Sequence, residues 1–167
     1  MRMNFSIGVE YALHCLVNMI SLNRPIGIKD LAEFQGVSES YLSKIFTKLV
    51  KSSIVQSTPG VKGGYELTKS PRNISFFDVV VAIEGSQPIF QCKNIIAKAV
   101  TNDDLEVNDD TVPCLINHTM LEAEKQMYDF LKTKTLLWLR ETLDETLDQE
   151  ILERNKKWFH KKLDERG

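Results

Sequence analysis

Apolar side chains in the first part of the chain follow the 3.6-residue period of amphipathic helices. Steps of four and three residues run through Phe5, Val9, Ala12, Leu16 and Met19, and they predict a first helix over residues 6–22. A short turn that contains a proline follows at residues 23–25, and a proline there ends the helix. The pattern therefore predicts a helical N-terminal unit that begins with an amphipathic helix.

The next apolar pattern predicts two helices joined by a tight turn. Residues 28–35 form a short periodic segment that Gly36 breaks. Ser38 then opens a second helix as a side-chain cap, with Val37 and Leu42 placed to pack together at its start. One face of this helix is apolar, and the other is rich in hydroxyl and ammonium groups, which suit bases and phosphates. The outward residues are Glu39, Ser40, Tyr41, Ser43, Lys44, Thr47, Lys48 and Lys51.

A hairpin is predicted directly after the two helices. Residues 54–56 and 65–67 are strand-like, and the glycine-rich loop 58–64 joins them. Its glycines permit a tight reversal and a close approach of the backbone to a phosphate, and Lys62 supplies a cation. This order of elements predicts a winged helix-turn-helix and therefore DNA as a partner. The alternative is a helix pair and hairpin that pack a small domain, with lysines outside because lysines usually are.

The second half of the chain predicts one further short helix and one long helix. A helix opens at Ser75 and runs to Gly85, which closes the DNA-binding unit at residue 88. Residues 89–113 are predicted to form an acidic exposed loop, in which residues 95–100 are apolar and residues 102–110 acidic. Residues 114–167 are predicted to be helical, with a charged terminal helix from residue 143. The fold class is thus mainly α with a small β-wing.

The long helix that begins at Cys114 carries an apolar seam with a seven-residue repeat, interrupted by Lys134. A sustained apolar seam on an elongated helix needs a partner, and a two-fold homodimer would present two recognition helices to adjacent half-sites. The alternative is that the seam packs on the first helix of the same chain. The seam comprises Ile116, Met120, Ala123, Met127, Phe130 and Leu137.

Charge and composition narrow the class of protein. Residues 1–72 have a net charge of +4 and residues 73–167 a net charge of −6, as expected of a cationic DNA-reading unit on an acidic body. No stretch is long and apolar enough to span a membrane, and residues 1–8 lack the plan of a signal peptide, so we expect a cytoplasmic protein. Nucleotide-binding, zinc-protease and serine-hydrolase motifs are not found, so we expect no enzyme.

Several short motifs, in this order, resemble the Rrf2 family of bacterial winged-helix repressors, the type represented by IscR, NsrR and CymR. The motifs are Tyr11-Ala12-Leu13, Leu31-Ala32, Gly36-Val37-Ser38, Tyr41-Leu42, Gly63-Gly64-Tyr65-Glu66-Leu67, Asp78-Val79-Val80 and Ile83-Glu84-Gly85. The resemblance implies a homodimer with Ser40, Tyr41, Ser43 and Lys44 against a major groove and residues 59–64 at the backbone or minor groove. Members often carry an arginine where this chain has Pro59.

Three residues are candidates for sensing: Cys92, Cys114 and His118. Family members that hold an iron–sulfur cluster resemble one another in having three close cysteines after the Glu-Gly pair, whereas here Cys92 stands there alone and Cys114 follows 22 positions later. We therefore expect no cofactor. The alternatives are a metal, since Cys114 and His118 share a helix face, and a thiol switch, since a helix N-terminus favours the thiolate.

Two functions follow from these observations. The first is a dimeric, sequence-specific DNA-binding repressor, with phosphates bound by lysines and bases read by the second helix. The second is a protein-interaction sensor of the same fold that binds a metabolic enzyme and has weak or no DNA affinity, an alternative that Pro59 favours. Partner regulation and DNA binding can coexist. The candidate DNA contacts are Ser38, Ser40, Tyr41, Ser43, Lys44, Thr47, Lys48, Lys51, Gly60, Lys62 and Gly63.

Overall fold

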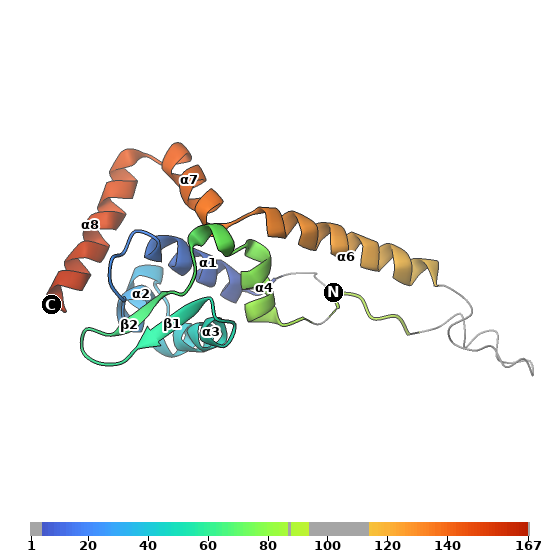
Figure 1. Ribbon diagram of the computed structural model, residues 1–167, viewed down its shortest axis with the longest axis horizontal. Coiled ribbons are helices and arrows are strands. Elements are labelled where there is room, and N and C mark those ends of the chain that lie inside the picture. Colours follow the sequence, from blue (N-terminus) through green and yellow to red (C-terminus); the bar gives the residue numbers. More distant parts are fainter. Residues whose placement is uncertain (1–4, 87, 94–113, 167) are drawn as a thin grey trace, which may run out of the picture.

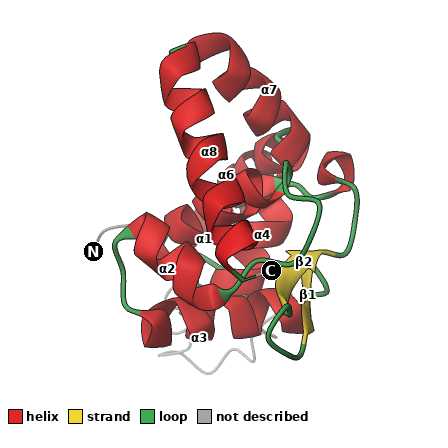
Figure 2. Ribbon diagram, turned by 90° about the vertical axis from the view of Figure 1, so that its left-hand side faces the viewer, coloured by secondary structure: helices red, strands yellow, loops and turns green. Residues whose placement is uncertain are grey.

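The structure, a computed structural model, describes residues 5–86, 88–93 and 114–166. It is mainly helical with one two-stranded antiparallel sheet (Figures 1 and 2), as the sequence predicted. The predicted apolar and acidic segments at residues 95–100 and 102–110 lie outside the described residues. The elements are α1 Ile7–Met19, α2 Ile28–Gln35, α3 Glu39–Lys51, β1 Val55–Thr58, β2 Gly64–Leu67, a 3₁₀ turn Pro71–Asn73, α4 Phe76–Glu84, α6 Leu115–Thr133, α7 Leu136–Thr146 and α8 Gln149–Glu165.

The core lies where α1 meets α2, α3 and α4. Ala12 and Leu16 of α1 are fully buried against Leu42 and Phe46 of α3, so the predicted apolar faces do meet. Cys15 is part of the same core, and its burial raises the pKa of its thiol to about 12. This cysteine is therefore a small apolar core residue rather than a reactive thiol.

Local capping signals set the boundaries of the helices. Gly36 ends α2 in the left-handed conformation at φ 67°, and the Ser38 hydroxyl accepts the Tyr41 amide at 3.3 Å as the N-cap of α3. Ser75 opens α4 with a capping box, because its hydroxyl accepts the Asp78 amide at 3.1 Å while the Asp78 carboxylate accepts the Ser75 amide at 2.8 Å. These three starts and stops agree with the sequence prediction.

The long C-terminal helix is shorter than predicted. α6 ends at Thr133, Lys134 is extended, and Thr135 caps the separate helix α7 by accepting the Trp138 amide at 3.1 Å. The cause is tertiary: the Phe76 amide donates to the Lys134 carbonyl at 2.7 Å, which draws the chain out of the helix to pair with the start of α4. A continuous helix through Leu137 was therefore the wrong prediction, and Leu137 lies on α7.

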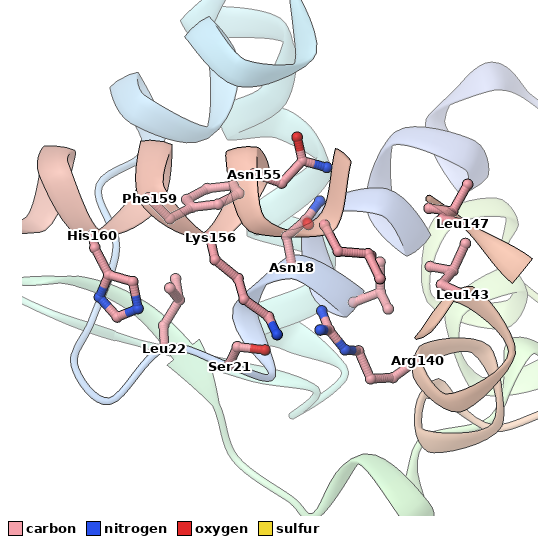
Figure 3. Close-up of a pocket in the computed structure, with 12 residues that line it drawn as sticks. Asn18, Ser21, Leu22, Arg140, Leu143, Leu147, Asn155, Lys156, Phe159 and His160 are labelled. Atoms are coloured by element: carbon pink, nitrogen blue, oxygen red, sulfur yellow. The ribbon is translucent and has the colours of Figure 1, made fainter. Parts of the chain in front are cut away.

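The two last helices fold back onto the rest of the molecule. Leu136 of α7 and Phe159 and Leu163 of α8 belong to the same core cluster as α1 to α4. Between α1, α7 and α8 lies a cavity of about 50 Å³, into which Arg140 and Lys156 project (Figure 3). Small-molecule sites usually have roughly 300–1,000 Å³, so this cavity has room for water rather than for an effector.

Candidate nucleic-acid interface

The outer face of α3 carries a stripe of polar side chains, Ser40, Lys44, Thr47 and Lys51, which we call the α3 stripe. All four are exposed, and their spacing of four, three and four residues places them on one side of the helix. The opposite side is the buried face, which consists of Leu42, Ile45, Phe46 and Leu49. Helix α3 thus presents two hydroxyl and two ammonium groups to solvent along its whole length.

Three other predicted contacts lie at the edges of the α3 stripe, and the side chains of two of them make contacts within the fold. The Tyr41 ring packs edge-on against Tyr11, with 6.0 Å between ring centroids. The Lys48 ammonium donates a hydrogen bond to the Ile83 carbonyl at 2.6 Å, at the C-terminal end of α4. On the other edge Ser43 is half-buried, and its carbonyl accepts the Thr47 hydroxyl at 2.8 Å. The structure therefore distinguishes Lys44 and Lys51, which are exposed on the stripe, from Lys48, which is hydrogen-bonded to α4.

The wing is a hairpin of β1 and β2, in register from the pair Val55 and Leu67 to the pair Thr58 and Gly64. Two glycines are sterically required: a Cβ at Gly63 would collide with the Thr58 carbonyl oxygen, and one at Gly64 with the Ile26 carbonyl oxygen. The hairpin is also joined to the segment before α2, because the Tyr65 amide donates to the Ile26 carbonyl at 2.8 Å. The wing is thus tied to the helix-turn-helix at its base.

The wing and α3 lie on the same side of the molecule, and α7 lies on the opposite side (Figures 1 and 2). Lys62 at the tip of the wing is exposed, and the neighbouring Val61 is 84% exposed. The structure therefore brings α3, which carries the stripe, and the wing, which carries Lys62, to the same side of the molecule. This arrangement suits a duplex with a deep groove and a charged backbone.

One contact of the wing could not be expected from the sequence. Arg166, which follows α8, donates from Nη2 to the Gly63 carbonyl at 2.9 Å and to the Val61 carbonyl at 3.5 Å. The partners are more than 100 residues apart in the sequence, and Arg166 stands in a charged segment with nothing to mark it.

The predicted sensing residues lie near the start of α6. The Cys114 sulfur is the N-cap and accepts the Asn117 amide at 3.5 Å. This hydrogen bond is the main cause that lowers the pKa of Cys114, and a hydrogen bond from the Cys92 side chain lowers it further. His118 is exposed on the first turn of α6. Within the described residues no group of three or more His, Cys, Asp or Glu side chains could hold a metal.

Helix α6 leaves most of its apolar seam uncovered. It has no fully buried residue; Ile116 is 63% exposed and Phe130 60% exposed. Met120 and Met127 are half-buried, and Ala123 is exposed. Near its C-terminal end the helix packs on α4, where the Tyr128 and Phe77 rings lie 5.1 Å apart. The apolar seam of α6 is therefore not buried in the core of this chain.

Comparison with known proteins agrees with this geometry. The model of the Rrf2 family, described as an iron-dependent transcriptional regulator, matches residues 5–142. The chain belongs to the Rrf2 family. This Rrf2 protein is 33% identical over 146 residues to an HTH-type transcriptional regulator, YffB, of Lactococcus lactis, covering 86% of this chain and 89% of that one. It is a DNA-binding transcriptional regulator, and its relatives are regulators rather than enzymes.

Solved structures have the same fold. The IscR of T. potens is 25% identical, with a TM-score of 0.59 over 88% of this chain and 93% of that one. The CymR of B. subtilis, described as its global cysteine regulator, is 21% identical with a TM-score of 0.61 over 85% of this chain and 98% of that one. No helix in the part of the Rrf2 chain that the structure describes could cross a membrane.

The family description implies iron, so we tested whether the thiols fit a cluster. Iron–sulfur clusters are usually held by several converging thiolates. The structure brings two thiols together, those of Cys92 and Cys114, while Cys15 is sealed in the core. The 20 residues 94–113 contribute neither cysteine nor histidine to the sequence. The residues therefore do not fit a three-cysteine cluster within one chain.

Proposed function

We propose that this Rrf2 protein is a homodimeric, sequence-specific transcriptional repressor that inserts α3 into a major groove and lays the wing on the DNA backbone or minor groove. The observation that carries the proposal is the α3 stripe, exposed over the whole helix and on the same side as the wing. A DNA-binding helix needs donors for base edges and cations for phosphates at this spacing, and the stripe supplies both.

We assign the contacts by chemistry. Lys44 and Lys51 of the α3 stripe and Lys62 of the wing are exposed ammonium groups that would bind phosphates. Ser40 and Thr47 lie on the stripe and Tyr41 and Ser43 at its edges, where hydroxyl groups would read base edges. We leave Lys48 out of the phosphate contacts, because its ammonium is already bonded to the end of α4.

The homodimer is proposed from the uncovered seam of α6. Ile116 and Phe130 expose more than half of their area to solvent, which is costly for large apolar side chains that recur along one helix. A second apolar surface, a groove of about 730 Å³, lies between α1 and α7 and includes Phe5, Ile7 and Leu143. A second copy of the chain would cover both surfaces and place two α3 helices on adjacent half-sites.

Selection of fragmented bacterial DNA on the purified protein, at physiological salt and with thiols reduced, tests the proposal. We expect a palindromic motif to be enriched, because a two-fold dimer reads two inverted half-sites. Repression is then measured with a reporter gene behind a promoter that carries the motif. Selection that enriches no motif, reduced or oxidised, would contradict DNA recognition and favour the protein-interaction module instead.

A second proposal concerns the signal, and the observation that favours it is the place of Cys114 at the N-cap of α6, where the Asn117 amide and the Cys92 side chain lower the pKa of its thiol. We infer that a hydroperoxide oxidises this pair to a disulfide. The Cys114 thiolate attacks the peroxide, the O–O bond breaks, and sulfenic acid forms with release of water or an alcohol. The Cys92 thiol then attacks the Cys114 sulfur, the S–O bond breaks, and water leaves.

Peptide mass spectrometry after treatment with hydrogen peroxide tests the thiol proposal. We expect a Cys92–Cys114 cross-link that a reductant removes, together with a change in affinity for the selected motif. The Cys92→Ala variant should stop at sulfenic acid, and the buried Cys15 should remain reduced in both proteins. Oxidation that leaves the two thiols unlinked would contradict the pairing.

A further inference from the structure

The side chain of Arg166 lies where three parts of the molecule meet. Its Nη2 atom bonds to the carbonyls of Gly63 and Val61 in the wing at 2.9 and 3.5 Å, and its Nη1 atom is 3.7 Å from the Asp30 carboxylate on α2. The guanidinium also lies against Gly27, where a Cβ would be 3.0 Å from it. One planar cation thus joins the end of α8, the start of α2 and the tip of the wing.

The position of Arg166 is fixed because α8 is anchored on the helix-turn-helix. Phe159 of α8 is buried and packs on Phe34 of α2, with 4.5 Å between ring centroids. The Lys162 ammonium donates to the Glu33 carboxylate at 2.8 Å. These contacts hold the last turn of α8 beside α2. The Arg166 side chain, which follows that turn, therefore starts from a fixed position and reaches the wing.

The wing tip has little structure of its own to hold it. Residues 59–63 lie between the two strands, and Gly60 has a φ of 103°, which favours glycine. Within this described loop the turn is closed by the Gly63 amide, which donates to the Gly60 carbonyl at 3.0 Å. The two carbonyls bonded by Arg166 flank Lys62, the residue we propose to bind a phosphate. The contact from Arg166 therefore bears directly on where Lys62 is presented.

We propose that Arg166 is a positioning residue for DNA binding: it holds the wing tip against the helix-turn-helix. Lys62 can then reach the DNA backbone without the wing loop first having to become ordered. This inference rests on the proposed function, because it assumes that the wing contacts DNA. Arg166 and α8 lie beyond residues 5–142, the part that the family model matches. A tether of this kind lowers the entropy lost by the loop when it binds.

The first test compares Arg166→Ala and Arg166→Lys with the full wild-type chain, and uses Arg154→Ala, at an exposed arginine of α8, as the matched control. Hydrogen exchange of the wing peptide, without DNA, measures the tether itself. We expect faster exchange in residues 58–65 of Arg166→Ala and Arg166→Lys and no change in Arg154→Ala. The thermal unfolding curve verifies that α8 stays docked, since Phe159 and Leu163 are untouched.

The second test measures affinity for the selected motif by fluorescence anisotropy over a range of salt concentrations. We expect Arg166→Ala to bind roughly tenfold more weakly, because the two hydrogen bonds that hold the wing tip are lost. The slope of log affinity against log salt should stay the same, because Arg166 itself contacts no phosphate. A slope that falls by about 0.9 would instead mean a direct phosphate contact and would overturn the positioning role.

Two further outcomes distinguish this inference from the proposed function. If wing exchange and affinity are both unchanged in Arg166→Ala, the inference is wrong while the repressor proposal stands. If wild-type protein binds no DNA and Arg166→Ala still exchanges faster in the wing, the proposed function is wrong, and Arg166 is a tether without a role in DNA binding.

Discussion

The Lys48 ammonium of α3 donates a hydrogen bond to the carbonyl of Ile83, 2.6 Å away in the last turn of α4. Carbonyls at the end of a helix lack partners within the helix and carry a partial negative charge, which a cation stabilises. One of the lysines that the sequence predicts as a phosphate contact is therefore part of the joint between two helices.

The first prediction separates this lysine from its neighbour Lys44. Lys48→Met should lower the free energy of unfolding by about 0.5–1.5 kcal/mol, because the Ile83 carbonyl loses its partner. Lys44→Met should leave stability nearly unchanged and reduce the salt dependence of DNA binding by about one phosphate contact. Urea titration and anisotropy at several salt concentrations measure the two effects. Equal salt slopes in the two variants would contradict the assignment.

The second prediction concerns the wing turn. Gly63→Ala should lower the free energy of unfolding by about 1–3 kcal/mol, because the new methyl group would collide with the Thr58 carbonyl and open the hairpin. DNA affinity should fall with it. Lys62→Ala is the matched control one residue away, and it should change stability by no more than about 0.5 kcal/mol while still weakening binding. Similar unfolding curves for both variants would show that the turn tolerates a side chain.

The third prediction tests the dimer. Phe130→Asp and Ile116→Asp should convert the dimer to monomer, because a carboxylate would have to be desolvated in the apolar interface. Sedimentation velocity gives the masses, and far-ultraviolet circular dichroism shows whether the helices persist. Gln126→Asp adds the same charge at an exposed polar position of α6 and should leave the dimer intact. A wild-type protein that sediments as a monomer would exclude the interface altogether.

The fourth prediction follows from the thiols. Because the pKa of Cys114 is lowered, its alkylation by iodoacetamide should reach half its maximal rate at a lower pH than that of an ordinary thiol. Cys15, whose pKa is raised to about 12, should be labelled only after unfolding. Cys92→Ala removes one hydrogen bond to the thiolate, so the profile of Cys114 should shift to higher pH. A profile that Cys92→Ala leaves in place would show that the two side chains act independently.

Short-range chemistry made the winged domain predictable from the sequence. The hydroxyl of Ser38 caps α3, Gly36 takes the left-handed conformation, and Ser75 forms a capping box; each signal acts within four residues. The two-strand wing likewise follows from a strand pattern around a glycine-rich loop. Such contacts are present in the local sequence and depend little on the rest of the chain.

Long-range contacts decided what the sequence could not reveal. The bond from Lys48 to Ile83 spans 35 residues, and the bond from Arg166 to Gly63 spans 103. The end of α6 at Thr133 depends on backbone pairing with residues near Ser75, which overrides the apolar repeat. The candidate site was thus predicted from the sequence as a set of exposed residues, whereas the hydrogen bond that ties Lys48 to α4 required the structure.

The backbone pairing of residues 134–136 with residues 74–76 has a mechanical consequence. Helix α6 has 19 residues and is therefore about 28 Å long, with Cys114 at one end and this joint at the other. A rigid rod fixed at one end acts as a lever. The Cys114 end of α6 is thus joined through this rod to the first turn of α4, whose last turn receives the hydrogen bond from Lys48 of α3. Cys114 and α3, although distant, are connected through one continuous helix and α4.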